Sequence, residues 1–243
     1  RVPLERFEAY REATRDVFAD LAGHRLHGVS LRTRGDAFAA RATLYAGRYF
    51  DAMGVPPVLG RFPREGETGQ VVISHALWQR DWGGAPDVVG SAVWVDGRAY
   101  NVAGVVSSRF QGAVFGTPVD VWLGMPEYVA GRPRTFDHWV TPFGRLRDGV
   151  GREGALAAVQ AAGARIPDED ATIRHINLEP LGGLTGEGRR IAGQFLTLQL
   201  VAGLLVLFIA ASNIAGMLLA RAVARQRETA VRLAMGAGRW RLI

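Results

Sequence analysis

A run of uncharged residues near the C-terminal end dominates the hydrophobic pattern of this chain. Residues 191–220 read IAGQFLTLQLVAGLLVLFIAASNIAGMLLA, with Arg190 before them and Arg221 after them. As a helix this run measures roughly 45 Å at about 1.5 Å per residue, whereas a bilayer core needs only about 20 apolar residues. The pattern therefore predicts a transmembrane helix over 191–220, which can tilt or continue beyond the lipid. A buried helix of a soluble protein is the alternative, but such helices rarely run this long without a charge.

The pattern before this run begins with an amphipathic stretch. Residues 4–22 place apolar side chains at near-helical spacing and charges on the other face. Pro3 suits the first turn of a helix and Gly23 suits a C-terminal cap. We therefore predict a helix over 4–22 that lies on a sheet or on another helix.

The remaining predicted elements are short, because Gly and Pro interrupt the chain often. In chain order they are a hairpin over 27–46, a helical turn over 47–54 that ends on Gly54, a strand over 71–74, a helix over 75–83 that Ser74 caps and Gly83-Gly84 ends, two strands over 91–106 joined at Asp96-Gly97, a strand over 119–123, a strand with a turn over 140–149, a helix over 151–166 and a strand over 174–181, with loops over 107–118 and 124–138.

This order of elements predicts an α+β fold, since strand–helix–strand occurs twice with a β-rich insertion between. We expect a mixed sheet with helices on one face, and a smaller β-rich lobe. The predicted parts are a two-lobed domain over 1–181 with its β-rich lobe at about 85–123, a Gly-rich linker over 182–190, the transmembrane helix over 191–220, and a basic segment with a short amphipathic helix over 221–243.

Charge is distributed unevenly around the apolar run. Residues 1–190 hold 23 Arg against 22 acidic residues, whereas residues 221–243 hold six Arg against one Glu. This excess on one side is the positive-inside signature, which places 221–243 in the cytoplasm and 1–190 outside it. Because nearly all of the net charge of +6 lies beside the predicted span, the charge does not indicate nucleic-acid binding.

Candidate chemistry is sparse along the chain. There is no Cys, which excludes disulfides and thiol catalysis, and there is no Lys, which excludes a GxxxxGK[ST] P-loop. Ser74-His75 lacks an acid placed by any motif and is better explained as the start of a helix. His24 and His27 have no evident third metal ligand, and the acidic run 168–170 is typical of a solvated loop. We therefore expect no catalytic residue, no metal and no cofactor.

Four stretches together resemble the MacB/FtsX group of ABC-transporter permeases. They are GRYFDAMGVPPVLGRFP at 47–63, VVISHALWQRDWGGAPDVVGSAVWVDGRAYNVAGVV at 71–106, FGRLRDGVGREGALAAVQA at 143–161, and SNIAGMLLARAVARQRETAVRLAMGAGRWRLI at 212–243. The wording of these blocks is closest to the acidobacterial duplicated orphan permease branch. Because the chain starts at Arg1 rather than Met and stops within a basic stretch, we expect it to be a fragment. The resemblance implies that this fragment lacks a first membrane helix before residue 1 and later helices after residue 243.

The resemblance implies partners and assigns roles to residues. It implies a separate ABC ATPase subunit and a second permease unit, either as a dimer or as a fused duplicate. Glu228 and Arg232 lie four residues apart, on one helical face, and in the resembled family this segment contacts the ATPase. The residues predicted to couple to the ATPase are Arg227, Glu228, Arg232, Met235 and Gly236.

Within the span, a few polar and small residues stand out. Ser212 and Gly216 form a small-xxx-small pair beside Asn213, which favours close packing against a neighbouring helix. Gln194, Thr197 and Gln199 cluster at the other end of the run.

The alternative interpretation of the basic segment 221–243 is a simple basic membrane anchor.

Two functions from different classes fit these features. The first is a permease subunit of an exporter in the bacterial inner membrane, which transmits motion from a cytoplasmic ATPase to the domain outside. The second is a membrane-tethered sensor or adaptor domain that transports nothing. An extracellular hydrolase would need an acid–base constellation, and none is evident. No residue selects a transported substrate.

Overall fold

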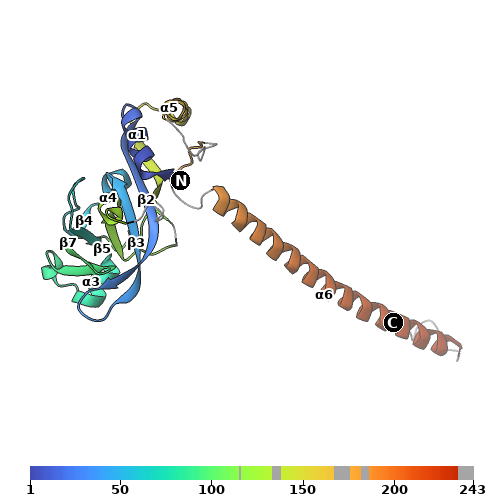
Figure 1. Cartoon of the computed structure of the whole chain (residues 1–243). Helices are drawn as coiled ribbons and strands as arrows, with labels where there is room; N and C mark the ends of the chain where they lie inside the picture. The colour runs from blue at the N-terminus through green and yellow to red at the C-terminus, as the bar shows by residue number, and fades with distance from the viewer. Residues whose placement is uncertain (115, 133–137, 167–175, 182–185, 235–243) are drawn as a thin grey trace. The chain divides into compact units, whose positions relative to one another are not determined.

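The computed structural model describes residues 1–114, 116–132, 138–166, 176–181 and 186–234. The chain divides into two compact units, Arg1–Gly183 and Leu184–Ile243. The first unit is a domain of strands and short helices, and the second is built on one long helix (Figure 1). Each unit is described by itself below.

Within the described residues of the first unit, the strands form one mixed sheet in the order β1-β9-β2-β3-β8-β5-β7-β4. Strand β6 pairs with both β2 and β7, so the sheet closes into a ring of six strands, β2-β3-β8-β5-β7-β6. The pairings β3–β8 and β5–β7 are parallel and the others antiparallel. The strand bounds are β1 Val2–Pro3, β2 Phe18–Arg32, β3 Phe38–Gly47, β4 Pro57–Gly60, β5 Gln70–Ile73, β6 Ala92–Val95, β7 Arg98–Val106, β8 Val121–Gly124 and β9 Trp139–Leu146.

Helices cover both sides of this sheet. Because successive side chains of a strand point to opposite faces, Val71 and Ile73 of β5 lie in one core and Val72 in another. The closed ring of six strands forms a small barrel. The first core fills this barrel and receives side chains from α1, α3 and α4, whereas the second core lies under α2. The helix bounds are α1 Leu4–Ala13, α2 Tyr49–Met53, α3 His75–Trp82, α4 Met125–Val129, α5 Arg152–Arg165 and α6 Gly186–Ala234, with a 3-10 turn at Pro86–Val88.

The α+β prediction of a mixed sheet with helices is confirmed, but the helices pack on both faces of the sheet and not on the one face that the sequence predicted. Strands β6, β7 and β8, which lie in the β-rich part predicted around 85–123, are hydrogen-bonded into the same sheet as β2 and β3. The closure through β6 rests on two residue pairs, Leu31 with Val95 and Arg32 with Trp94. A pairing of so few residues, far apart in the sequence, leaves no periodic pattern from which it could be predicted.

Several local predictions hold. Ser74 Oγ accepts a hydrogen bond from the Leu77 backbone N–H at 3.0 Å and so caps α3. Gly54 and Gly83 end α2 and α3 in the left-handed conformation. Asp96 and Gly97 both have positive φ, as the two-residue turn between β6 and β7 requires.

The predicted helix over 4–22 is wrong in its second half. Helix α1 stops at Ala13, where the Thr14 Oγ1 donates to the Tyr10 carbonyl at 2.7 Å. Strand β2 begins at Phe18 and pairs with both β3 and β9. Gly23 is therefore not a helix cap: it lies in β2, where a Cβ would come within 2.8 Å of the Val140 side chain.

Other boundaries also differ from the prediction. Helix α4 forms inside the predicted loop 124–138, and the described part of the predicted strand 174–181, residues 176–181, is not a strand. Helix α6 begins at Gly186, inside the predicted linker. It also continues past residue 220 to Ala234, because no Gly or Pro interrupts that stretch.

One strand glycine should be decisive for the stability of the barrel. Replacing Gly104 of β7 with Ala would put a Cβ 2.5 Å from the Arg61 carbonyl oxygen and 2.9 Å from that of Leu59. Both are backbone atoms of the segment paired with β7, so the strands must separate. We expect Gly104→Ala to lower the free energy of unfolding of residues 1–183 by about 2 kcal/mol in urea titrations.

Gly28→Ala is the matched control for this prediction. Gly28 also lies in a strand, but an added Cβ there meets no atom within 4 Å. The control should change the free energy of unfolding by less than about 0.5 kcal/mol. Equal effects of the two substitutions would contradict the close approach of β4 to β7.

Candidate functional site

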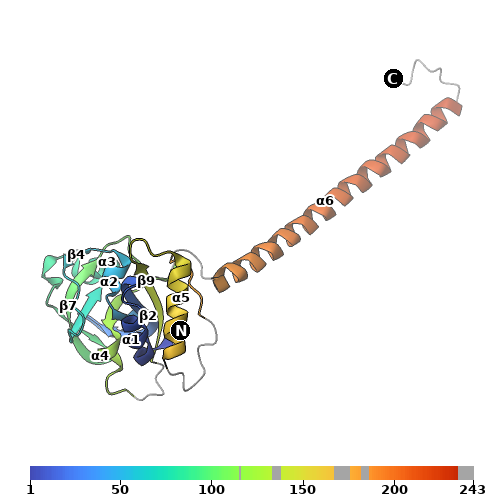
Figure 2. The same ribbon diagram turned by 90° about the horizontal axis from the view of Figure 1, so that it is seen from above.

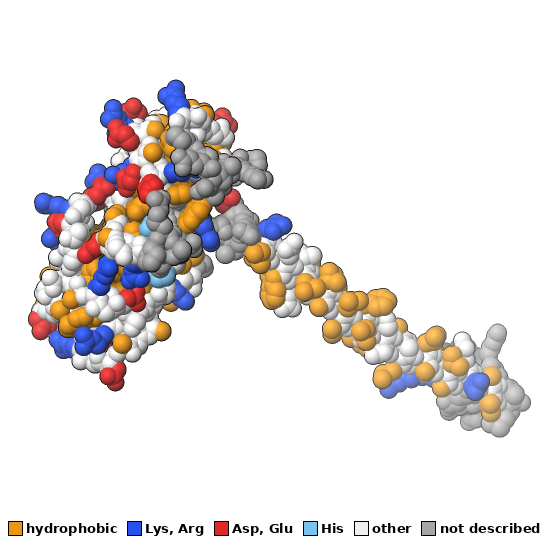
Figure 3. Space-filling view, in the orientation of Figure 1, with side chains coloured by type: hydrophobic (Ala, Val, Ile, Leu, Met, Phe, Trp, Pro, Cys, Tyr) orange, Lys and Arg blue, Asp and Glu red, His pale blue; other side chains and the backbone are white. Residues whose placement is uncertain are grey.

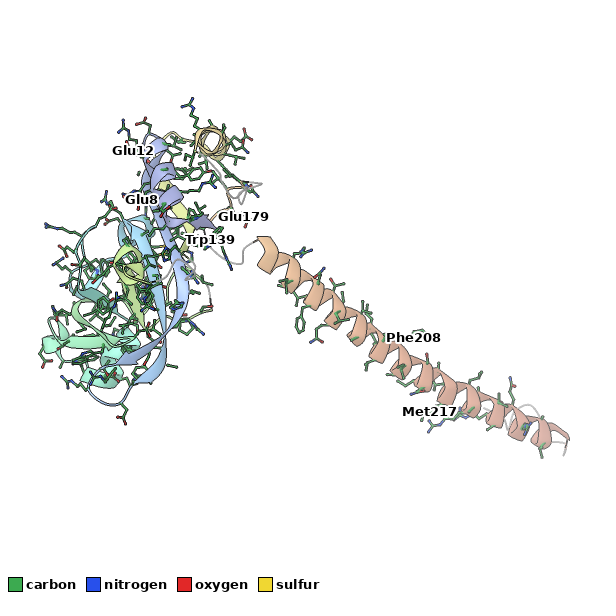
Figure 4. The ribbon with its side chains drawn as sticks, viewed as in Figure 1. Glu8, Glu12, Trp139, Glu179, Phe208 and Met217 are labelled. Carbon is green, nitrogen blue, oxygen red and sulfur yellow. The ribbon has the colours of Figure 1, made fainter. Side chains whose placement is uncertain are left out.

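Helix α6 is the longest element of the chain and carries most of the residues with a predicted role. It runs from Gly186 to Ala234 without interruption, and its 49 residues would extend about 73 Å. The stretch Arg190–Arg227 is long and apolar enough to cross a membrane, and its side chains are not buried within the chain. Hydrophobic side chains lie along the face of α6 that Figure 3 shows, and Phe208 and Met217 project from the helix (Figure 4).

The predicted packing residues lie on this helix. Ser212, Asn213 and Gly216 are all exposed, and a Cβ added at Gly216 would meet no atom within 4 Å. A helix turns 100° per residue, so these three positions fall within one third of the circumference. Towards the other end of the span, Thr197 Oγ1 donates back to the Gly193 carbonyl at 2.8 Å, which satisfies the hydroxyl inside its own helix.

The predicted coupling residues lie at the far end of the same helix. Arg227 is exposed on α6, and Glu228 and Arg232 stand four residues apart within its helical backbone. Met235 and Gly236 lie outside the described residues. The two predicted groups thus share one continuous helix, with about 24 Å along its axis between residues 216 and 232.

Helices α1 and α5, which lie near the two ends of the first unit's sequence, pack against each other. Helix α1 follows β1 near residue 1, and α5 is the last helix that the structure describes before residue 183. Figure 2 shows α1 and α5 side by side. At Gly163 of α5 an added Cβ would lie 2.7 Å from the Tyr10 hydroxyl and 3.1 Å from the Ile176 side chain. Glycine therefore lets α5 approach α1 and the segment that follows it.

A polar network that the sequence did not predict joins the β6–β7 turn to α4 and β2. The Asp96 carboxylate accepts hydrogen bonds from the Ser30 backbone N–H at 2.8 Å and the Tyr128 hydroxyl at 2.5 Å, and it pairs with Arg132 at 3.4 Å. Burial alone would raise the pKa of Asp96, but these donors lower it, while burial and the Asp96 acceptor raise the pKa of Tyr128. The network stabilises the turn and offers no reactive group.

The candidate catalytic and metal-binding residues are accounted for structurally. Ser74 caps α3, and the His75 ring packs edge-on against Trp78 at 5.4 Å between ring centroids. His24 packs against Phe143 and His27 against Tyr128. Within the part of the chain that the structure describes, no three His, Cys, Asp or Glu side chains gather where a metal ion would bind. Residues 168–170 lie outside the described residues.

His24 should make the stability of the domain depend on pH. Its side chain is 8% exposed, and burial lowers its pKa to about 4 from an ordinary value near 6.5. Between pH 6.5 and pH 4 the His24 side chain binds a proton in the unfolded chain but not in the folded domain. The contribution of neutral His24 to the free energy of unfolding is therefore fully present above pH 6.5 and is lost as the pH falls towards 4. The loss should reach about 3 kcal/mol.

The variant His24→Phe keeps an aromatic ring beside Phe143 but cannot be protonated. Its free energy of unfolding should therefore fall less than that of the wild type between pH 7 and pH 4, as measured by urea titration of residues 1–183. A difference between His24→Phe and wild type that is constant over this pH range would contradict the prediction.

Comparison with known proteins agrees with this architecture. Residues 2–162 match the family described as the MacB-like periplasmic core domain. The periplasmic region of MacB from Actinobacillus actinomycetemcomitans is similar in structure, with a TM-score of 0.54 and 14% identity over 67% of this chain and 75% of that one. The extracellular domain of the noncanonic ABC-type transporter YknZ from Gram-positive bacteria has a TM-score of 0.53 and 11% identity, over 68% and 83% of the two chains. No curated protein sequence matches the chain.

Proposed function

This chain belongs to the family of MacB-like periplasmic core domains of ABC-transporter permeases, and from that premise we propose that it is a mechanical element of an export system. In this proposal a separate ATPase in the cytoplasm moves the end of α6, and α6 carries the motion across the bacterial inner membrane to the domain of residues 1–181. The domain outside then binds or releases the exported substrate. The resemblance at 212–243 implies a second permease unit beside this one.

The continuity of α6 is the observation that carries the proposal. Between Gly186 and Ala234 the helix has no Pro and no break, so it is stiff enough to pass a displacement along its axis. Its apolar part separates a nearly neutral domain from an Arg-rich end. A simple membrane anchor needs about 20 residues, whereas this helix continues well beyond the lipid on its basic side.

The packing at the start and end of the domain supports the same proposal. The Tyr10–Gly163–Ile176 contact ties α1 to α5 and to the segment that leads towards α6. A membrane helix before residue 1, as the resemblance implies, would connect through β1 to α1. Motion of either membrane connection would then reach the domain at the same α1–α5 contact.

Residues 1–243 contain no Lys and therefore no phosphate-binding loop of the GxxxxGK[ST] kind. In this proposal ATP is hydrolysed by a separate ABC ATPase. The Glu228–Arg232 pair is the proposed contact with this partner. Its charges would select the partner's surface and its helix would receive the displacement.

Exchanging the charges of this pair tests the proposal. In the full-length protein, Glu228→Arg combined with Arg232→Glu keeps two opposite charges at i and i+4 on α6 but reverses their order. We expect the exchange to reduce the ATP turnover of the co-purified ATPase to the level of the ATPase alone. The measurement is the phosphate release rate with and without the permease in lipid nanodiscs.

The control is Gln226→Ala, at an exposed position of the same helix that faces away from Glu228 and Arg232. It should keep the permease-dependent part of the ATP turnover. Wild-type turnover in the charge-exchanged variant would contradict the coupling role. Failure of any ABC ATPase to co-purify with the full-length protein would instead favour the membrane-tethered sensor or adaptor.

A further inference from the structure

A cavity of about 210 Å³ opens on the first unit where four separate segments of the chain meet. Residues 11–21, from the end of α1 to the start of β2, form one side, and Arg48 before α2, Glu65 after β4 and Arg147 after β9 complete it. This volume is smaller than the sites of drug-sized ligands, which begin at about 300 Å³. The lining residues are Arg11, Arg15, Phe18, Ala19, Asp20, Leu21, Arg48, Glu65 and Arg147.

The lining carries four guanidinium groups against two carboxylates. Two of the four are held firmly by acids. Arg11 pairs with Glu8 at 2.8 Å through one Nη and with Glu65 through the other. Arg48 pairs with Asp20 at 3.1 Å and with Asp51 at 3.0 Å. Asp20 is only 14% exposed and fixes Arg48 at the wall of the cavity.

The other two guanidinium groups keep an open edge. Arg147 donates through Nε to the Arg15 carbonyl oxygen at 3.0 Å, and within the described residues its two Nη groups have no acceptor. Arg15 pairs through Nη1 with Glu12 at 2.8 Å, at an exposed position where such a pair is weak. Glu8 and Glu12 project from α1 (Figure 4). The Nε contact orients Arg147 while leaving two parallel donors for a ligand.

Two parallel N–H donors on one guanidinium match two oxygens of a carboxylate or phosphate group. Phe18 and Leu21 also line the cavity, so part of its wall is apolar. We propose that this cavity is a binding site for a phosphate-type oxyanion, with Arg147 as its principal ligand and Arg15 as a further donor. The oxyanion is either a free phosphate group or the headgroup phosphate of an anionic lipid.

Inorganic phosphate is the first probe, added to the purified chain in non-ionic detergent. We expect phosphate to raise the thermal unfolding midpoint of the domain more than chloride does at equal ionic strength. Arg147→Gln should weaken phosphate binding about tenfold, since it removes two hydrogen bonds to a charged ligand. Arg109→Gln, which removes an exposed Arg outside the cavity, should leave phosphate binding unchanged.

A variant with the opposite sign separates ligand binding from a general loss of folding. Glu65→Gln removes one of the two negative charges that line the cavity and weakens the pairing of Arg11. It should tighten phosphate binding about threefold. Improved binding cannot arise from a misfolded domain, so this arm stays informative even if Arg147→Gln is poorly folded.

Native mass spectrometry with mixed micelles identifies the source of the phosphate group. Retention of phosphatidylglycerol over phosphatidylcholine by wild type, and its loss in Arg147→Gln, would support a lipid headgroup site. A phosphate effect that depends on Arg147, without such lipid selectivity, would support a soluble anion. Binding of either probe that is the same in wild type, Arg147→Gln and Glu65→Gln, or no binding of either, would overturn the proposal.

Discussion

Placing Arg at position 207, near the middle of α6, should reduce membrane insertion of this helix about a hundredfold. Leu207 is exposed on the helix and lies near the centre of the apolar stretch Arg190–Arg227. A guanidinium at the bilayer centre costs about 2.5–3.5 kcal/mol on insertion scales, whereas Leu contributes favourably. The measurement is integration of residues 186–227 in a host membrane protein that carries glycosylation acceptor sites on both sides of the segment.

Ile191→Arg is the matched control, because it adds the same charge beside Arg190 at the end of the apolar stretch. There the side chain can extend its charged group to the interface, so the cost should stay below about 1 kcal/mol. Equal integration of Leu207→Arg and Ile191→Arg would contradict a membrane span. It would favour the alternative in which α6 is a helix buried against another part of a soluble assembly.

The parts of the fold that depend on local chemistry were predictable from the sequence. Ser74 as a helix cap, Gly54 and Gly83 as helix ends, and Asp96-Gly97 as a hairpin turn each have a short-range physical cause. The apolar run was equally clear, because no other part of the chain avoids charge over 30 residues. The resemblance at 47–63 and 71–106 then gave the family.

The parts that depend on distant contacts were not predictable. The apolar residues at 17, 18 and 21 fit a helix as well as a strand over so short a stretch, and pairing of β2 with β9 decides for the strand. Closure of the barrel depends on Leu31 meeting Val95. The cavity around Arg147 unites residues that are up to 136 positions apart, such as Arg11 and Arg147, so no sequence motif marks it.

The predicted sites divide in the same way. The sequence of the span alone predicts a packing role for Ser212, Asn213 and Gly216, because polar and small residues in lipid favour contact with another helix. The roles of Arg227, Glu228 and Arg232 rest on the resemblance, since the residues alone are compatible with a basic anchor. The continuity of α6 adds a physical connection between the two groups that the residue pattern did not contain.

Breaking that connection should uncouple the ATPase from the domain outside. Ala230→Pro removes the hydrogen bond from residue 230 to the carbonyl of residue 226 and forces a ring against the preceding turn, which costs about 3 kcal/mol and kinks the helix. Displacement at the basic end would then bend α6 at the kink. We expect Ala230→Pro in the full-length protein to lose the permease-dependent part of the ATP turnover while the ATPase still co-purifies.

Ala230→Ser and Ala230→Gly separate stiffness from side-chain contact at this exposed position. Ser keeps the helix at a small cost, and Gly weakens it by about 1 kcal/mol without forcing a kink. A transmitter should therefore keep its coupling in Ala230→Ser, lose a part of it in Ala230→Gly and lose it in Ala230→Pro, whereas a passive anchor should treat all three alike. Position 230 lies outside the first unit, Arg1–Gly183, so these substitutions should leave the fold of that domain unchanged. If the domain stays folded in all three full-length variants, any loss of coupling is caused by the change in the helix itself.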